Sequence, residues 1–132
     1  MDYLLDTSFL IGLWRGRGKG LEASFLAAHS DSVLGLPWIA KGEFLSGAVI
    51  AEHDIEKVTG FLAGYPVFWP DEQTLLQYAA LYARLHAQRK LVGPNDLWIA
   101  AAAIRRELPL LTRNVKEFSR VQGLRVIDYG AA

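Results

Sequence analysis

Residues 3–8 read Tyr3-Leu4-Leu5-Asp6-Thr7-Ser8, a short apolar run that ends at once in an acid and two hydroxyl side chains. The apolar run predicts a buried β-strand. The polar residues after it can cap a helix, in which apolar side chains recur at helical spacing: Phe9, Leu10, Leu13 and Trp14. A strand followed directly by a helix is the pattern that the rest of the chain continues.

Strands and helices alternate to the end of the sequence. We expect further strands at residues 32–36, 66–69, 110–112 and 125–127, and helices over 21–29, 37–51, 54–64, 71–90 and 96–107. In the helix over 71–90, four side chains fall on one face: Leu75, Ala79, Tyr82 and His86. This alternation predicts an α/β fold with a mainly parallel sheet. Ligands of such sheets bind outside the carboxyl ends of the strands.

Length and composition indicate one globular domain over residues 1–132, because 52% of the side chains are hydrophobic and 21% are charged. The fourteen basic and fourteen acidic side chains cancel. This balance excludes proteins that hold nucleic acid by overall positive charge, so any contact with nucleic acid has to be local.

The sequence has no cysteine, which excludes disulfides, thiolate nucleophiles and cysteine-bound zinc. Its three histidines lie far apart and show no paired metal-binding spacing: His29, His53 and His86. Carboxylates would therefore hold any metal ion, which favours hard ions such as Mg²⁺ or Mn²⁺.

The longest apolar run covers residues 97–104 and is too short to span a membrane. The first residues show neither a basic segment nor a cleavable apolar stretch. Together with the lack of cysteine, these features predict a cytoplasmic protein without membrane contact.

Three acids have settings that allow a functional role. Asp6 follows the first strand and should lie at the carboxyl edge of the sheet, although an aspartate there can also be a plain helix cap. Asp96 precedes a wholly apolar segment, where it can also be a charge favoured by the helix macrodipole, with Asn95 as the cap. Glu43 lies among small residues in the helix over 37–51, where exposed glutamates are common.

Two polar residues follow the strand over 110–112. Asn114 and Glu117 have the spacing of a capping box, which explains both without any chemistry. Alternatively they complete a polar cluster at the carboxyl edge. Residues 16–20 alternate glycine with basic side chains, but they follow a helix and lack the Gly-Lys-Ser/Thr ending of a phosphate loop, so they predict a basic surface loop.

Taken together, these segments resemble the PIN-domain ribonucleases, and within them the VapC-type toxins of toxin–antitoxin modules. The resemblance covers essentially the whole chain. It depends on residues 3–8, on Lys41-Gly42-Glu43-Phe44 with Gly47, on residues 93–101, and on residues 111–118 with 123–126.

The resemblance implies a three-layer PIN-like fold, a mainly parallel sheet of about five strands flanked by helices. It also implies that Asp6, Glu43 and Asp96 are the catalytic residues and the ligands of Mg²⁺ or Mn²⁺. The family often adds a fourth acid, but position 114 here is an asparagine, so Glu117 or Asn114 is expected at that place.

Four further residues receive roles on this interpretation. Ser8 and Thr112 are expected to hydrogen-bond to the metal ligands, and Arg113 and Lys116 to contact phosphate. A carboxylate-held Mg²⁺ lowers the pKa of a bound water and neutralises charge on a phosphodiester, so an acidic site can cleave an acidic polymer.

The implied function is a metal-dependent endoribonuclease, the toxin of a toxin–antitoxin pair. Its partners would be an RNA substrate, a small antitoxin docked on the apolar N-terminal helices, and a second copy in a homodimer. The alternative is a catalytically weak PIN-like module that binds protein, which Asn114 favours and the three intact acids oppose. Two other classes of protein fit less well. A haloacid-dehalogenase-like phosphatase needs a second aspartate where this chain has Ser8, and a receiver domain needs an acidic pair near the end of the first strand, which this chain lacks.

Overall fold

The sheet is built around the first strand. The computed structural model describes residues 1–90 and 92–130. Strand β1 (Tyr3–Leu5) lies at the centre of five parallel strands in the order β3-β2-β1-β4-β5. The other strands are β2 (Leu34–Pro37), β3 (Val67–Phe68), β4 (Leu110–Thr112) and β5 (Val126–Asp128). The predicted α/β fold with a parallel sheet is confirmed.

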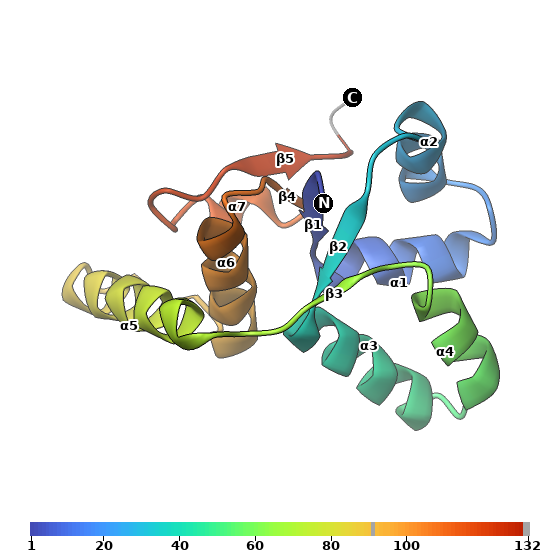
Figure 1. Cartoon of the computed structure of the whole chain (residues 1–132), viewed down its shortest axis with the longest axis horizontal. Helices are drawn as coiled ribbons and strands as arrows, with labels where there is room; N and C mark the ends of the chain where they lie inside the picture. Colours follow the sequence, from blue (N-terminus) through green and yellow to red (C-terminus); the bar gives the residue numbers. More distant parts are fainter. Residues whose placement is uncertain (91, 131–132) are drawn as a thin grey trace.

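Helices cover the sheet from both sides (Figure 1). They are α1 (Thr7–Gly16), α2 (Leu21–Ala28), α3 (Trp38–Ile50), α4 (Ile55–Leu62), α5 (Glu72–Ala87), α6 (Pro94–Arg106) and α7 (Val115–Phe118). In Figure 1, α5 and α6 lie to one side of the strands and α1, α2 and α4 to the other. In the part of the chain that the structure describes, no helix is both long and apolar enough to cross a membrane.

The core joins β1 to helix α6. Leu4 and Leu5 of β1 are completely buried, as are Ile99 and the four alanines at positions 100–103 of α6. Small side chains allow neighbouring elements to approach this helix closely. Asp96 is therefore a charged residue in the first turn of a helix whose next two turns are buried in the core.

The apolar face of α5 that the sequence predicted, which includes Leu75 and Tyr82, is the exposed face of the helix. Leu75 and Tyr82 are 46% and 55% exposed, whereas Leu81 and Leu85 are buried. The helix carries apolar side chains on two faces, and the stacking of Tyr78 on Trp98 of α6, with ring centroids 3.7 Å apart, turns the other face inward. Periodicity alone could not choose between these faces.

Helices α1 and α2 meet at a glycine. A Cβ atom at Gly12 would overlap the carboxylate of Glu22, which is only 8% exposed. Gly12 therefore permits this close contact between the two helices. Glycine has a low helix propensity, and the close packing that it allows here compensates for that cost.

We expect Gly12→Ala to lower the free energy of unfolding by about 1–3 kcal/mol, because the added methyl group overpacks the contact with Glu22. Gly60→Ala in α4 is the matched control, since a Cβ there meets open space. The control should raise stability by up to about 1 kcal/mol through helix propensity alone. Urea unfolding measures both, and a Gly12→Ala protein as stable as the Gly60→Ala protein would contradict the assignment.

Candidate active site

Asp6 occupies the junction between β1 and α1. Its backbone is extended and its N–H donates to the carbonyl of Leu111, which continues the pairing of β1 with β4. The side chain does not cap α1, so the interpretation of Asp6 as a plain helix cap is wrong. It is 5% exposed and points instead to the carboxyl edge of the sheet, where it meets the residues that end β4.

Two hydroxyl groups hold the Asp6 carboxylate. Thr112 Oγ1 donates to Asp6 Oδ2 over 2.7 Å, and Ser8 Oγ donates to the same oxygen over 2.9 Å. Thr112 is fully buried at the end of β4, and its Oγ1 also accepts the N–H of Asn114. These contacts fit the supporting roles predicted for Ser8 and Thr112.

Glu43 approaches from α3 and binds two neighbouring side chains. Thr7 Oγ1 donates to Glu43 Oε1 over 2.8 Å, and Asn95 Nδ2 donates to Oε2 over 3.3 Å. Sequence reasoning missed both partners. Asn95 was expected to cap α6, but Gly93 occupies the cap position, so the amide of Asn95 is free to reach Glu43. The sequence offers one signal for these two partners of Glu43: Thr7 directly follows Asp6, and Asn95 directly precedes Asp96.

Glu117 and Asn114 do not form a capping box, which was one of the two interpretations of this pair. The side chain of Asn114 makes no cap hydrogen bond to α7. Its Nδ2 instead donates to Glu117 Oε2 over 3.0 Å, while Glu117 Oε1 accepts the N–H of Gly93 over 3.0 Å. Glu117 therefore connects α7 to Gly93, the N-cap residue of α6, three positions before Asp96.

The acids influence each other's ionisation. Burial raises the pKa of Asp96 to about 7, helped by the negative charges of Asp6, Glu117 and Glu43. Burial also raises the pKa of Asp6, against the lowering effect of its hydroxyl partners. The pKa of Glu117 is lowered, first by the Gly93 N–H and then by Asn114. The four carboxylates thus lie close enough to repel each other, and Asp96 is the one that keeps its proton most readily.

The donor set suits a hard divalent cation. Carboxylate oxygens are the ligands that Mg²⁺ and Mn²⁺ prefer, and a cation would favour the ionised form of Asp96 against the burial and the repulsion that raise its pKa. Among the described residues, no three acidic or histidine side chains already form a cage for an ion. Both oxygens of Glu43 and of Glu117 accept hydrogen bonds from neighbouring donors, and each oxygen keeps a further lone pair with which it could bind a cation.

The predicted phosphate contacts lie at the surface. Arg113 and Lys116 are exposed, and neither forms an ion pair within residues 1–90 and 92–130. The guanidinium of Arg113 lies beside Gly130, close to the end of β5. Lys116 lies on α7 next to Glu117. Their role in binding phosphate remains a prediction.

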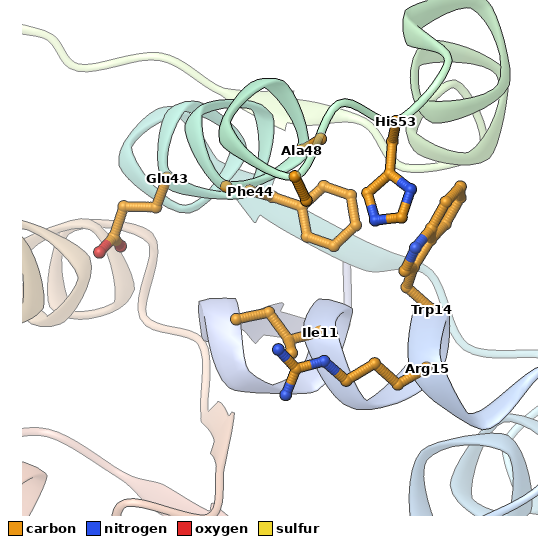
Figure 2. A pocket seen from close by; sticks show the side chains of 9 residues that line it. Ile11, Trp14, Arg15, Glu43, Phe44, Ala48 and His53 are labelled. Carbon is orange, nitrogen blue, oxygen red and sulfur yellow. The ribbon is translucent and has the colours of Figure 1, made fainter.

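A groove between α1 and α3 leads away from Glu43. Figure 2 shows Phe44, Ala48 and His53 facing Ile11, Trp14 and Arg15 across it, with Glu43 at one end. The ring of Trp14 packs edge-on against Phe44 and His53, at centroid distances of 6.0 and 5.5 Å. The groove is therefore largely apolar, with one basic and one acidic side chain on its walls.

Similarity to known proteins agrees with this geometry. A model of the PIN domain matches residues 3–124. The chain belongs to the PIN-domain family. It is 48% identical over 136 residues to Ribonuclease VapC1 of Rickettsia felis, with 96% of each chain covered. It is 32% identical over 132 residues to Ribonuclease VapC1 of Haemophilus influenzae strain R2866, with 98% of each covered.

Solved structures of PIN-domain relatives show the same fold. The chain superposes on DNA-bound VapBC from Salmonella typhimurium with a TM-score of 0.87 and 26% identity, covering 98% of both chains. It superposes on VapBC-1 from nontypeable Haemophilus influenzae with a TM-score of 0.84 and 29% identity, covering 98% of this chain and 99% of that one. The resemblance to VapC-type proteins that the sequence predicted is confirmed.

The raised pKa of Asp96 makes the stability depend on pH. An ordinary aspartate ionises near 3.8, but Asp96 in the folded protein ionises near 7. The folded state thus binds more protons between these values, so wild-type stability in chelator should fall as pH rises from about 4 to about 7. Asp96→Asn should remove this loss and raise the Tm at pH 7–8, with the gain vanishing toward pH 4.

Thermal melts in chelator across this pH range measure the effect. Asp54→Asn is the matched control, because Asp54 caps α4 through the Glu56 N–H and asparagine caps equally well. If Asp96→Asn lowered the Tm at pH 8, Asp96 would be an ordinary first-turn charge.

Proposed function

We propose that this protein is an endoribonuclease that depends on Mg²⁺ or Mn²⁺, and that it is the toxin of a toxin–antitoxin pair. The observation that carries the proposal is the cluster of four carboxylates in which burial, together with the neighbouring negative charges, raises the pKa of Asp96 to about 7. The relatives named ribonucleases, and the tRNA(fMet)-specific endonuclease VapC of Salmonella typhimurium at 27% identity over 132 residues, support an RNA substrate.

Asp6 and Asp96 would hold the metal, with Glu43 as a further ligand or as the group that orients the attacking water. A bound divalent cation lowers the pKa of water and stabilises the charge that develops on a phosphodiester. The hydroxyls of Ser8 and Thr112 fix Oδ2 of Asp6 and leave its other oxygen outside these two bonds. Glu43 accepts hydrogen bonds from the side chains of Thr7 and Asn95 and could turn from them toward the metal or the attacking water.

Glu117 rather than Asn114 supplies the fourth negative charge in this proposal. The side-chain amide of Asn114 donates a hydrogen bond to the Glu117 carboxylate, so Asn114 helps to orient that carboxylate. Arg113 directly precedes Asn114 and Lys116 directly precedes Glu117 in the chain, and the two basic side chains would bind the RNA backbone beside the cleaved bond.

The groove between α1 and α3 is our candidate surface for the antitoxin. Its apolar walls suit an amphipathic segment, and it opens beside Glu43, so an occupant would lie next to the acids. The relatives in solved structures are VapBC toxin–antitoxin complexes. The exposed Leu75, Leu76 and Tyr82 of α5 would pack in the homodimer. The cytoplasmic location stays a prediction.

Asp6→Asn and Asp96→Asn should each reduce RNA cleavage by roughly 100-fold or more, since even residues that only support metal ligands cost about 10–100-fold. Cleavage of a labelled RNA with and without Mg²⁺ measures the loss, and circular dichroism verifies that each variant is folded. Activity in excess chelator, or unchanged cleavage by either variant, would contradict the proposal and favour the protein-binding module.

Glu117→Gln keeps an oxygen acceptor for the Gly93 N–H but removes the charge. We expect the Mg²⁺ concentration for half-maximal cleavage to rise about 10-fold. Glu72→Gln is the control, because Glu72 adjoins Asp71, which pairs with Arg105 at the opposite end of α6 from Asp96. An unchanged Mg²⁺ dependence would mean that Glu117 only holds α7 against the start of α6 and does not bind metal.

A further inference from the structure

An open depression borders the candidate active site and has no role in the chemistry proposed above. It lies between α3 and the start of α6 and has a volume of about 310 Å³. Six residues line it: Trp38, Ile39, Gly42, Glu43, Ser46 and Asn95. Small-molecule sites in proteins measure about 300–1,000 Å³, so this volume suits one planar ring system better than a larger ligand. Because Asn95 donates to Glu43, the wall of the depression is also part of the candidate active site.

Trp38 reaches this place because the sheet is parallel. It follows β2 directly, as Asp6 follows β1, and the two strands are neighbours with Leu4 opposite Gly35. Residues that follow neighbouring parallel strands lie at the same carboxyl edge of the sheet. Trp38 is therefore an aromatic residue at the edge where the acids gather.

The indole ring of Trp38 has no parallel partner among the described residues. It is half-buried and meets the rings of Phe68 and Trp98 at interplanar angles of 61° and 67°. Trp98, by contrast, is covered by Tyr78, which stacks on it with ring centroids 3.7 Å apart. Aromatic rings stack face to face in an offset arrangement. The part of the Trp38 ring that lines the depression is therefore available to a planar ligand.

The polar groups of the depression suit the edge of a nucleobase. Asn95 donates one side-chain N–H to Glu43, and its second N–H and its carbonyl oxygen have no hydrogen bond in the part of the chain that the structure describes. The Ser46 hydroxyl donates to the carbonyl of Gly42 over 2.9 Å, which leaves its oxygen as an acceptor. Amide and hydroxyl groups of this kind contact the hydrogen-bonding edges of bases. No arginine or lysine is among the lining residues described here, so the depression suits an uncharged base better than a phosphate.

We propose that this depression binds one unpaired nucleobase of a single-stranded RNA substrate, next to the cleaved phosphodiester bond. Trp38 stacks on the face of the base, and Asn95 and Ser46 contact its edge. Single-stranded RNA offers such bases, because outside a duplex they are free to stack on aromatic side chains. This inference rests on the proposed function, in which RNA is cleaved at the adjoining acids.

An RNA that lacks one base tests the inference together with Trp38→Leu. The substrate is an oligoribonucleotide that the wild type cleaves at one bond, prepared with single abasic positions on either side of that bond. One of these positions should raise the KM of the wild type about 10-fold, which is the loss expected for one stacked base. The kcat should change little, because stacking holds the substrate and the transition state alike. Trp38→Leu should have the same raised KM for the intact RNA and should not distinguish it from the abasic RNA.

Two further variants separate the contact with the base from a general loosening of the structure. Trp38→Phe keeps an aromatic face and should retain the dependence on the base that Trp38→Leu loses. Gly42→Leu fills the depression without overlapping the chain, since a Cβ at Gly42 meets open space, and it should raise KM as Trp38→Leu does. Gly60→Leu in α4 is the matched control, because a Cβ there also meets open space, and its KM should equal that of the wild type. Circular dichroism verifies that each variant is folded.

The outcomes distinguish this inference from the proposed function. A wild type that cleaves no RNA, or cleaves it in excess chelator, would overturn both. Metal-dependent cleavage in which no abasic position raises KM would overturn the base site alone, as would a Trp38→Leu protein that responds to the abasic position like the wild type. If that response stayed intact while Trp38→Leu changed the oligomeric state in size-exclusion chromatography, this face would be a contact between two copies of the chain and not a base site.

Discussion

The hydrogen bond from Thr112 to Asp6 is the contact on which the site depends. It joins the ends of two neighbouring parallel strands, β1 and β4, and both residues are buried. A buried carboxylate is costly unless donors surround it, and here the donors are hydroxyls that are themselves fixed by the sheet and by α1. The register of β1 on β4 therefore sets the position of Asp6, and every other acid is placed relative to it.

The remaining acids gather at a cost to stability. Glu43, Asp96 and Glu117 come from three helices, and their charges contribute to the raised pKa of Asp96. Such repulsion destabilises a folded protein that has no cation to neutralise it. Hydrogen bonds from Thr7 and Asn95 stabilise the Glu43 carboxylate, and those from Asn114 and Gly93 stabilise the Glu117 carboxylate. Electrostatic repulsion and shifted pKa values of this kind are typical of functional sites.

Much of this could be predicted from the sequence, because the relevant signals are local. Apolar runs followed by caps predicted the strands and helices, and an acid directly after a parallel strand has to lie at the carboxyl edge of the sheet. Asp6 was chosen on this basis, Asp96 because a charge there precedes a wholly apolar helix, and Glu43 because it lies among small residues; the resemblance to PIN-domain proteins joined the three. Their common location follows from the topology, while their roles remain proposals.

The tertiary structure decided what depends on side chains that meet across the fold. It decided which of two apolar faces of α5 is buried, the face with Leu81 and Leu85, on the side of the helix where Tyr78 stacks on Trp98 of α6. It replaced the predicted capping box by a bond between Asn114 and Glu117, because the N–H of Gly93, 24 residues away, competes for the same carboxylate. The sequence by itself determined the order of strands and helices and the acids at their ends, because these follow from neighbours along the chain. Which donors hold those acids depends on contacts between distant segments, and only the folded chain creates them.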